Sequence, residues 1–468
     1  SNLLVTMLDR CRLRGRRTTY VEGIAMSENQ SSVTLSSAPP MGVKLGSQLS
    51  IMMFLQYAIW GAWLPILYPY LLGHLQFSMT QVGIIFSVGA IGAIIGPFIA
   101  GQVADRYFST EKFLALSHLI GAVMVWFLST QTEYGAFLVM SLLYGLVYAP
   151  TLALTNSLSF HHLPDRDRDF GRVRVWGTIG WIVAGIGFGH YLGAFHTPDA
   201  AADIVGKAQD AGRAYAFRLS AILGAVMAVY CLTLPHTPPS KGEGKANASV
   251  EALGEIKKQP LLTLFLLAIP VSMIHQFYFV HTSAFLSILQ RETEAAGEFA
   301  TSINNVLGVG GGGLMTIGQM TEIAVLAAIP LVAKRFSRKT LLGIGLLAYA
   351  GRMALFAYTD SMFPILVGVA LHGVCFGCFI FVAFMVVDEE TTADIKASAQ
   401  NLFNLVIIGI GIIVGSYFAT SIVGSWATEN DKTNYTKLFS VPMWMAIACF
   451  TLLMVFYPGG KRKPAQAA

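Results

Sequence analysis

Long apolar runs recur along almost the whole chain, and they constrain its fold more than any other feature of the sequence. A run of about 18 residues or more, wound into an α-helix that rises about 1.5 Å per residue, can cross a hydrocarbon core of about 30 Å. The runs do not alternate apolar with polar residues, as the strands of a membrane β-barrel do. We therefore predict an all-α polytopic membrane protein.

Composition agrees with this fold class. Hydrophobic residues make up 54% of the 468 positions and charged residues only 12%, whereas about a quarter of an ordinary soluble chain is charged. The repeated runs indicate one helical membrane bundle rather than several soluble domains. We count about twelve spans, near 46–74, 79–104, 112–130, 134–160, 170–195, 214–234, 260–290, 303–333, 339–358, 361–387, 395–424 and 438–458.

Lysine and arginine collect in alternate connections between these spans. The intervening loops, such as 75–78, 131–133 and 359–360, carry almost none. Because basic residues mark cytoplasmic loops, we predict a multi-pass protein of the inner, or plasma, membrane with both termini in the cytoplasm. The basic residues concerned are Arg106, Lys112, Arg166, Arg168, Arg172, Lys241, Lys245, Lys257, Lys258, Lys334, Arg335, Arg338, Lys339, Lys461, Arg462 and Lys463.

The chain divides into two similar halves. Residues 235–259 are rich in proline, glycine, serine and charge, which is typical of a linker, and they separate six spans from six. The sequence "VADRYFSTEKFLAL" after the second span is echoed by "VAKRFSRKTLLGI" after the eighth. Such repeats are typical of transporters that rock two halves around a central site. We predict two pseudo-symmetric six-helix bundles at 46–234 and 260–458.

The two ends of the chain carry no predicted span. We expect residues 1–45 to be disordered and residues 459–468 to form a cytoplasmic tail. The sequence begins at Ser1 without a methionine, so Met26 is the expected biological start. A basic arm that binds the membrane surface is the alternative interpretation of the first residues.

A charged motif follows the second span. Asp105 and Arg106 are followed by Lys112, an arrangement that resembles the loop motif of the major facilitator superfamily, from which Glu111 departs. The resemblance implies the major facilitator fold, in which these charges hold the ends of neighbouring helices together in one state of the transport cycle. The alternative is a loop whose basic side chains only fix the topology.

A few polar side chains lie inside the fifth span. A charged side chain at the centre of a lipid-facing helix costs about 2.5 to 3.5 kcal/mol, so such residues should face a partner or an aqueous cavity. Arg174, Thr178 and Trp181 are spaced so that they share one face of the helix. Snorkelling of Arg174 to the membrane boundary is the alternative.

Glu322 lies well inside the predicted eighth span. Thr316, Gln319 and Glu322 lie close to one face of the eighth span, and about ten apolar or small residues flank Glu322 on each side. Because burial favours the neutral carboxyl group, Glu322 is a candidate for reversible proton binding. Structural pairing with Arg174 or Arg352 is the alternative.

Other hydrogen-bonding and aromatic residues accompany them. His275, Gln276 and Tyr278 lie on the seventh span, and His372 and Phe376 lie on the tenth. Amide and carboxylate groups bind hydroxyl groups, and aromatic faces stack on planar rings. The sequence therefore predicts a polar organic solute, bound in one aqueous cavity between the halves.

Two further motifs are better explained by packing. Cys375 and Cys378 have the C-x-x-C spacing, but they lie within a span without histidine or cysteine partners, so we expect neither a metal nor a redox site. The stretch "NNVLGVGGGGLM" (304–315) lacks the ending of a nucleotide-binding loop, which favours a glycine-rich gating helix. We find no plausible catalytic constellation and expect no enzymatic activity, no cofactor and no nucleic-acid partner.

Strings in both halves resemble the bacterial nucleoside:proton symporters, a branch of the major facilitator superfamily. The resemblance covers the first eleven spans and implies that Arg174, Thr178 and Trp181 contact the substrate. It further implies that Gln276, Gln319 and Glu322 bind nucleoside, and that Phe376 packs near the base. The strings are "FLQYAIWGAWL" (54–64), "YAPTLALTNSLSF" (148–160), "RVWGTIGW" (174–181), "LTLPHTP" (232–238), "ALFAYTD" (354–360) and "IKASAQNLF" (395–403).

Three positions depart from the pattern of that family. Phe279 stands where an asparagine is expected, His372 replaces a tyrosine, and Gly377 stands where an aspartate is expected. The aspartate is a plausible proton carrier, so coupling in this protein would use Glu322 or His372, or be absent. Phe279 and His372 remain candidate substrate-binding residues.

The sequence thus predicts a secondary transporter that imports nucleosides by alternating access, coupled to proton symport through Glu322 or His372. The expected partners are a nucleoside, a proton and the lipid bilayer, and by analogy with the superfamily we expect a monomer. The alternatives are an uncoupled nucleoside facilitator, or a sugar or drug transporter of the same superfamily.

Overall fold

The computed structural model describes residues 39–99, 109–238, 254–293, 297–392, 395–430 and 432–459. Within these ranges, twelve helical segments are long and apolar enough to cross a membrane, which confirms the predicted fold class. Most of the predicted N-terminal segment lies outside the described residues, and so do Met26, Asp105 and Arg106.

The first half of the chain contributes six spans. The first span is one long helix continued without a break by three short helical elements, and the sixth consists of two helices. In order they are α1 (Val43–Trp63) continued by η1 (Leu64–Ile66), α2 (Leu67–Pro69) and η2 (Tyr70–His74); α3 (Met79–Ile99); α5 (Thr110–Leu128); α6 (Tyr134–His162); α7 (Arg166–Phe195); and α8 (Ala202–Gly212) followed by α9 (Ala214–Cys231).

The second half contributes the other six spans, two of which change locally to π-helix. They are α11 (Leu261–Thr293); α12 (Glu298–Leu307) and α13 (Gly312–Arg335); α14 (Arg338–Tyr358); α15 (Met362–Cys375) with η4 (Phe376–Phe381) and α16 (Val382–Glu390); α17 (Lys396–Asn404) with η5 (Leu405–Ile410), α18 (Gly411–Tyr417), η6 (Phe418–Gly424) and α19 (Ser425–Ala427); and α20 (Tyr435–Phe456), which follows the two-stranded hairpin β1 (Thr428–Glu429) and β2 (Lys432–Thr433).

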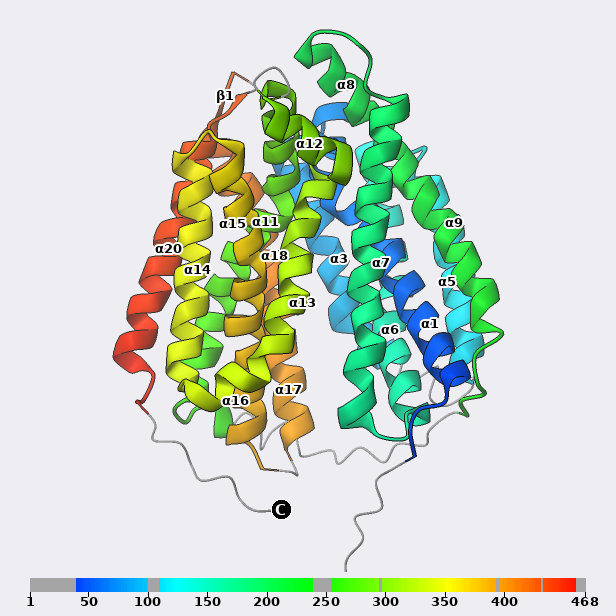
Figure 1. The fold of residues 1–468 in the computed structure, drawn as a ribbon, viewed down its shortest axis with the longest axis vertical. Coiled ribbons are helices and arrows are strands. Elements are labelled where there is room, and N and C mark those ends of the chain that lie inside the picture. Colours follow the sequence, from blue (N-terminus) through cyan, green and yellow to red (C-terminus); the bar gives the residue numbers. More distant parts are fainter. Residues whose placement is uncertain are drawn as a thin grey trace, which may run out of the picture. The chain divides into compact units, whose positions relative to one another are not determined.

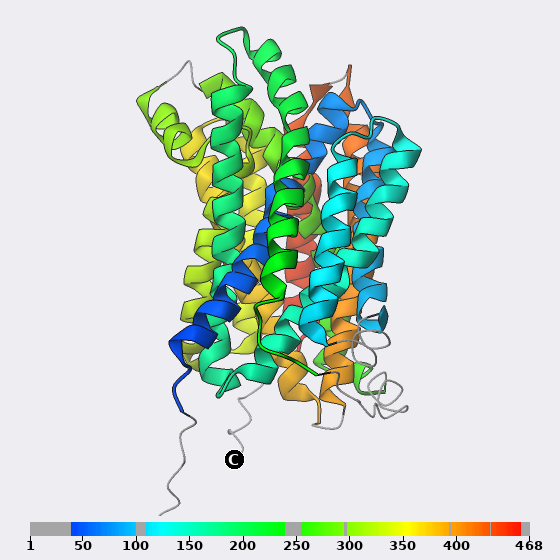
Figure 2. The same cartoon turned by 90° about the vertical axis from the view of Figure 1, so that its right-hand side faces the viewer.

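Each half has its own hydrophobic core. One large cluster of buried residues extends from Leu261 to Tyr457, and a second extends from Leu49 to Leu234 and includes only Val280 from the other half. The helices of the two halves lie on opposite sides of the view in Figure 1, and in Figure 2, turned by 90°, the helices of the first half lie in front. These separate cores support our proposed division at 46–234 and 260–458.

The halves meet along two seams, where α7 packs on α13 and α3 packs on α18. At the first seam Gly185 of α7 lies against Thr316 of α13, and a Cβ atom at Gly185 would stand 3.1 Å from the Thr316 methyl group. At the second seam the Ser87 hydroxyl group donates to the Ile413 carbonyl oxygen over 3.1 Å. Small residues therefore let the two backbones approach closely.

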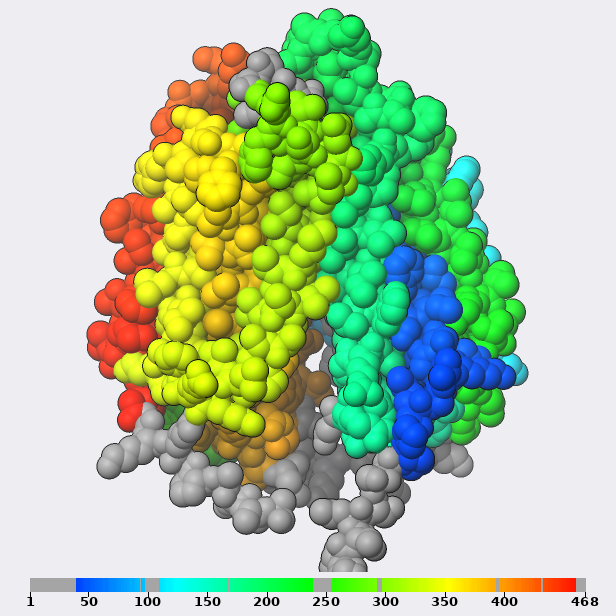
Figure 3. All heavy atoms as spheres, viewed as in Figure 1, coloured from blue at the N-terminus to red at the C-terminus, as the bar shows by residue number. Residues whose placement is uncertain are grey.

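We call the side where α9 ends and α11 begins the linker face. In the space-filling view α7 and α13 touch over their upper parts and separate toward the linker face, where a gap opens between them (Figure 3). The halves are joined at the opposite face instead, where His190 contacts the Val306 carbonyl oxygen at 3.2 Å and the Val309 amide donates to the Gly189 carbonyl oxygen at 3.2 Å.

A buried group that we call the outer latch also joins the halves at this opposite face. Arg213, between α8 and α9, is fully buried, forms an ion pair with Asp210, and donates to the Ser287 hydroxyl group at 3.2 Å and to the Gly310 carbonyl oxygen at 3.1 Å. Arg291 of α11 donates to the same Ser287 hydroxyl group at 2.7 Å. The structure is therefore closed at the face opposite the linker.

The predicted start of the eighth span is wrong. Instead of one helix from residue 303, α12 ends at Leu307 and α13 begins at Gly312. Gly308, Gly310 and Gly311 adopt φ values of +76°, +82° and +80°, a left-handed conformation that glycine adopts without steric cost and that ends a helix. The glycine-rich stretch is thus a helix break rather than a gating helix.

Candidate functional site

The two candidate proton-coupling residues lie together in the second half. Glu322 of α13 and His372 of α15 place Oε2 and Nε2 3.7 Å apart, with His372 buried and the Glu322 side chain 17% exposed. Gly373 lets the two helices meet here, because a Cβ atom at this position would stand 2.5 Å from the Glu322 backbone nitrogen. A side chain at residue 373 would therefore push the two coupling residues apart.

Glu322 is not paired with an arginine in the described part of the chain. The basic group within 4 Å of it is His372, so the alternative of direct pairing with Arg174 or Arg352 is wrong for this conformation. Arg174 does interact with Glu322 electrostatically from α7 in the other half. The carboxyl group therefore lies within reach of charges from both halves.

Arg352 of α14 lies behind His372. It is fully buried, and its Nη1 lies 3.1 Å from Nδ1 of His372. Its guanidinium carbon lies 4.4 Å from the centre of the Tyr278 ring and 5.0 Å from that of Tyr349. These aromatic faces stabilise the buried cation, because the ring quadrupole attracts positive charge.

Aromatic rings enclose His372 on its other sides. Tyr278 stacks on it with ring centres 4.6 Å apart, His275 stacks at 5.4 Å, and Phe279 approaches edge-on at 5.8 Å. The Nδ1 atom of His275 in turn lies 2.7 Å from the Tyr349 hydroxyl group. Phe279 is therefore part of the wall around the coupling pair.

The two candidate amides differ in their surroundings. Gln319 lies one helical turn from Glu322 on α13 and is buried, and its Oε1 has no hydrogen-bond partner among the described residues. Gln276 of α11 is also buried, but its Oε1 accepts from the Ser416 hydroxyl group of α18 at 3.4 Å. Gln319 thus has a free acceptor beside the carboxyl group, whereas Gln276 contacts α18.

The residues from the first half lie on α7. Arg174 places its guanidinium carbon 4.0 Å from the centre of the Tyr57 ring of α1. Trp181 packs edge-on against Trp60 at 5.4 Å and is buried, and Thr178 lies between them along the helix, half-buried. The predicted stripe therefore exists, and aromatic residues of α1 support both of its ends.

Gly377 is explained by its neighbour. A Cβ atom at this position would stand 2.6 Å from Cγ1 of Val325 on α13, so the branched side chain of Val325 fills the space that an aspartate would need. Phe376, beside it, begins the π-helical segment η4, and such π-turns are frequent at functional sites. Packing against Val325 thus disfavours a carboxylate at residue 377.

We expect Gly377→Asp to reduce stability. Crowding against Val325 should cost about 1–3 kcal/mol, the usual range for an overpacked core, and thermal unfolding of the purified protein measures it. Val325→Ala should restore much of the loss in the double variant, since it removes the contacting methyl groups. Equal unfolding temperatures for the Gly377→Asp and double variants would contradict this explanation.

The charged motif is described only in part. Asp105 and Arg106 lie outside the described residues, and the Lys112 side chain is exposed. Glu111, the departure from the motif, is buried; it accepts from the Thr237 amide at 3.0 Å and lies 2.8 Å from Nδ1 of His236. Glu111 therefore fastens the start of the linker to α5, while the role predicted for the other three stays a prediction.

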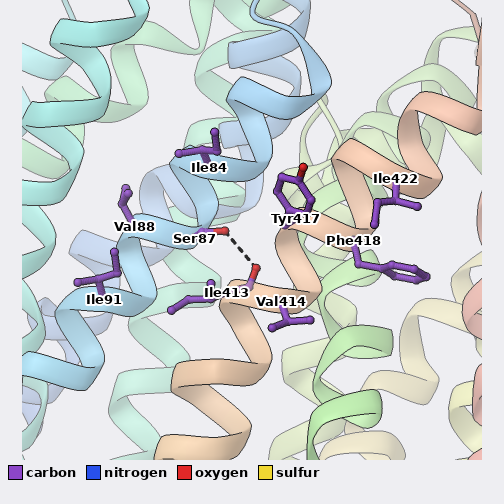
Figure 4. A pocket seen from close by; sticks show the side chains of 9 residues that line it. All are labelled: Ile84, Ser87, Val88, Ile91, Ile413, Val414, Tyr417, Phe418 and Ile422. Carbon is purple, nitrogen blue, oxygen red and sulfur yellow. Dashed lines mark hydrogen bonds between the residues drawn. The ribbon is translucent and has the colours of Figure 1, made fainter.

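One cavity of about 460 Å³ lies apart from these residues, between α3 and α18. Figure 4 shows that mostly apolar side chains line it, with the hydrogen bond of Ser87 crossing the seam. The candidate site residues do not line it, so the shared aqueous cavity stays a prediction. The lining residues are Ile84, Ser87, Val88, Ile91, Ile413, Val414, Tyr417, Phe418 and Ile422.

Sequence reasoning missed several residues of this region. Tyr57 and Tyr349 are ordinary aromatic residues in apolar helices, and the sequence gives no signal that would single them out. Arg352 could have been found, because it is an arginine inside an apolar span; we considered it only as a partner of Glu322.

Comparison with known proteins agrees with this arrangement. The family model described as Nucleoside H+ symporter matches residues 41–462. The Escherichia coli (strain K12) protein YegT is 33% identical over 429 residues, covering 89% of this chain and 94% of its own. The xanthosine permease of the same organism is 28% identical over 435 residues, covering 90% and 96%.

A solved structure agrees as well. The crystal structure of the nucleoside transporter NupG has a TM-score of 0.73 at 26% identity, covering 88% of this chain and 98% of that one. The family model, the relatives and the twelve-span fold confirm the resemblance found in the sequence. The chain belongs to the nucleoside:H+ symporter family.

Proposed function

We propose that the protein imports nucleosides together with protons by alternating access, and that Glu322 binds the proton. The observation that supports this most is the Glu322–His372 pair: a carboxyl group in the middle of a membrane span, 3.7 Å from a buried imidazole and within electrostatic reach of Arg174 in the other half. A carboxyl group in such surroundings can exchange a proton without leaving the membrane interior.

The same region offers groups suited to a nucleoside. The unpartnered Oε1 of Gln319 can accept from a ribose hydroxyl or a base N–H group. Arg174, Thr178 and Gln276 would add further hydrogen bonds. The rings of Trp181, Phe279 and Phe376 would stack on the base, since aromatic faces favour planar rings.

The conformation described here fits one state of the proposed cycle. The halves are joined at the face opposite the linker by the outer latch and separate toward the linker face. If the basic loops mark the cytoplasm, as we propose, the linker face is cytoplasmic and this is the inward-facing state that releases nucleoside and proton. We further propose that the protein acts as a monomer in the inner membrane.

Proton movement tests the coupling directly. In lightly buffered cells that produce the protein, addition of uridine should make the external medium more alkaline, since each nucleoside enters with a proton. Cells without the protein are the control. Uridine uptake without alkalinisation would show facilitated diffusion instead of symport. We consider this alternative because residue 377 is a glycine where the family pattern has a carboxylate.

Competition measurements test the substrate class. We expect unlabelled purine and pyrimidine nucleosides to reduce the uptake of radiolabelled uridine. Ribose should have little effect, because it lacks the planar base on which Trp181 and Phe376 would stack. Ribose that competes as well as uridine would identify a sugar transporter instead.

A further inference from the structure

Arg352 reaches the proposed coupling carboxyl group through His372. It lies on α14, is fully buried, and places Nη1 3.1 Å from His372 Nδ1, while Nε2 of the same ring faces Glu322 at 3.7 Å. The three side chains thus form a line, with the imidazole between a cation and a carboxyl group.

The contact with Arg352 determines which ring nitrogen of His372 carries the proton. A guanidinium group has five donors and no acceptor, so Nδ1 of His372 must accept and carries no proton. A neutral imidazole then carries its one proton on Nε2, the atom that faces Glu322. The tautomer of His372 therefore follows from its contact with Arg352.

We infer that Arg352 is a positioning residue that holds His372 as the neutral Nε2–H tautomer, so that His372 donates toward Glu322 and the transported proton binds Glu322 alone. This inference rests on the proposed function and decides between the two coupling candidates. The Nε2–Oε2 distance lies just beyond a hydrogen bond, so a small approach of α13 and α15 would complete the contact.

The surroundings of His372 oppose a second proton on its ring. An imidazolium would direct an N–H group at Nδ1 against the N–H groups of Arg352 and would bring two cations together in a buried site. The ionisable groups that contact His372 come from three helices: His275 and Tyr278 on α11, Glu322 on α13, and Arg352 on α14. Tyr349 lies beyond them against Arg352 and His275, Cys375 follows one turn along α15, and Arg174 of α7 acts on Glu322. Glu322 is the acidic group among them that can take a proton without such a conflict.

Nitrogen-15 NMR of ring-labelled histidines, recorded on the whole protein in lipid nanodiscs, tests the tautomer. The His372 signal is identified by its loss in His372→Gln. In the unaltered protein we expect an unprotonated Nδ1 and a protonated Nε2. A protonated Nδ1, whether as the other tautomer or as imidazolium, overturns the inference without the need for any variant of Arg352.

Two substitutions at residue 352 show whether the arginine is responsible. Arg352→Met removes the donor with little loss of volume, and we expect the single Nε2–H signal to be lost in favour of the other tautomer or a mixture. Arg352→Lys keeps a cationic group that can donate a hydrogen bond but cannot accept one, so we expect it to preserve the signal. The signal of His281, whose Nε2 lies 2.9 Å from the Ala419 carbonyl oxygen, is an internal reference; an unchanged His372 signal in Arg352→Met overturns the role of Arg352.

Proton transport separates this inference from the proposed function. A glutamine at residue 372 cannot be protonated but keeps an amide donor, so His372→Gln should transport uridine more slowly yet retain the proton-to-uridine ratio of the unaltered protein. A ratio reduced to zero in His372→Gln makes His372 the carrier and overturns the inference. If the unaltered protein moves no protons at all, the proposed symport fails, and the NMR result still decides the tautomer.

Discussion

Substitution of Glu322 by glutamine is expected to abolish the accumulation of nucleoside against a gradient. Glutamine keeps the size and polarity of the side chain but cannot bind and release a proton. One proton that enters down a potential of about 100 mV supplies about 2.3 kcal/mol, which supports an accumulation of about 50-fold. We therefore expect the ratio of internal to external uridine in energised proteoliposomes to fall from that order to about one.

Two controls accompany this variant. Glu133→Gln makes the same change at an exposed glutamate on the face opposite the linker. It should leave the accumulation ratio unchanged. Exchange of labelled for unlabelled uridine without a gradient shows whether Glu322→Gln still binds substrate. Accumulation by Glu322→Gln at the level of the unaltered protein would remove Glu322 as the proton-binding group.

Substitution of Arg213 by methionine is expected to open the face opposite the linker. Arg213 is fully buried and contacts Asp210, Ser287 and Gly310, so its loss leaves these groups without their common donor. Breaking a buried ion pair typically costs about 3–5 kcal/mol. Because the contacts to Ser287 and Gly310 join the halves, part of that cost should fall on the state closed at this face.

Distance measurements between spin labels detect this opening. Labels at the exposed positions Lys207 and Glu298, one in each half at the opposite face, should show a longer distance in Arg213→Met. Arg218→Met is the matched control, because Arg218 lies little more than one helical turn further along, on α9, but contacts Ser129, Trp126 and Tyr215 of its own half. Equal distances in the two variants would show that the outer latch does not hold the halves together.

The twelve spans could be predicted because their cause is local. Each needs only a run of apolar residues long enough for the bilayer, and the runs are separated by polar connections. The eighth span began too early in the prediction because residues 308–313 carry no charged or polar side chain that would mark a break, while the φ values that end the helix there depend on glycine's freedom and on neighbouring helices. The sixth span was predicted without α8 for the opposite reason: its first helix carries several polar residues.

The candidate site could be predicted only as far as residue type allowed. An acidic residue and an amide in an apolar span are visible in the sequence, and so Glu322 and Gln319 were found. The contact of Arg352 with His372 depends on how α14 packs on α15, and no spacing within one helix encodes it. Likewise, the reason for a glycine at residue 377 is the position of Val325 on the neighbouring helix, which the sequence does not encode.

The helix break between α12 and α13 has a consequence for how the two halves hold each other. The carbonyl oxygens of Gly308 and Gly310 and the amides of Val309 and Gly311 are free of helical partners; Gln290 clamps the first and last of these, and Arg213 and Gly189 of the other half take the remaining two. The second half thus offers main-chain atoms of the helix break to the other half, one to the Arg213 side chain and one to the Gly189 main chain. Because the glycine conformations expose these atoms, a side chain at Gly308, Gly310 or Gly311 would disturb the joint even though none of the three contributes a side chain to it.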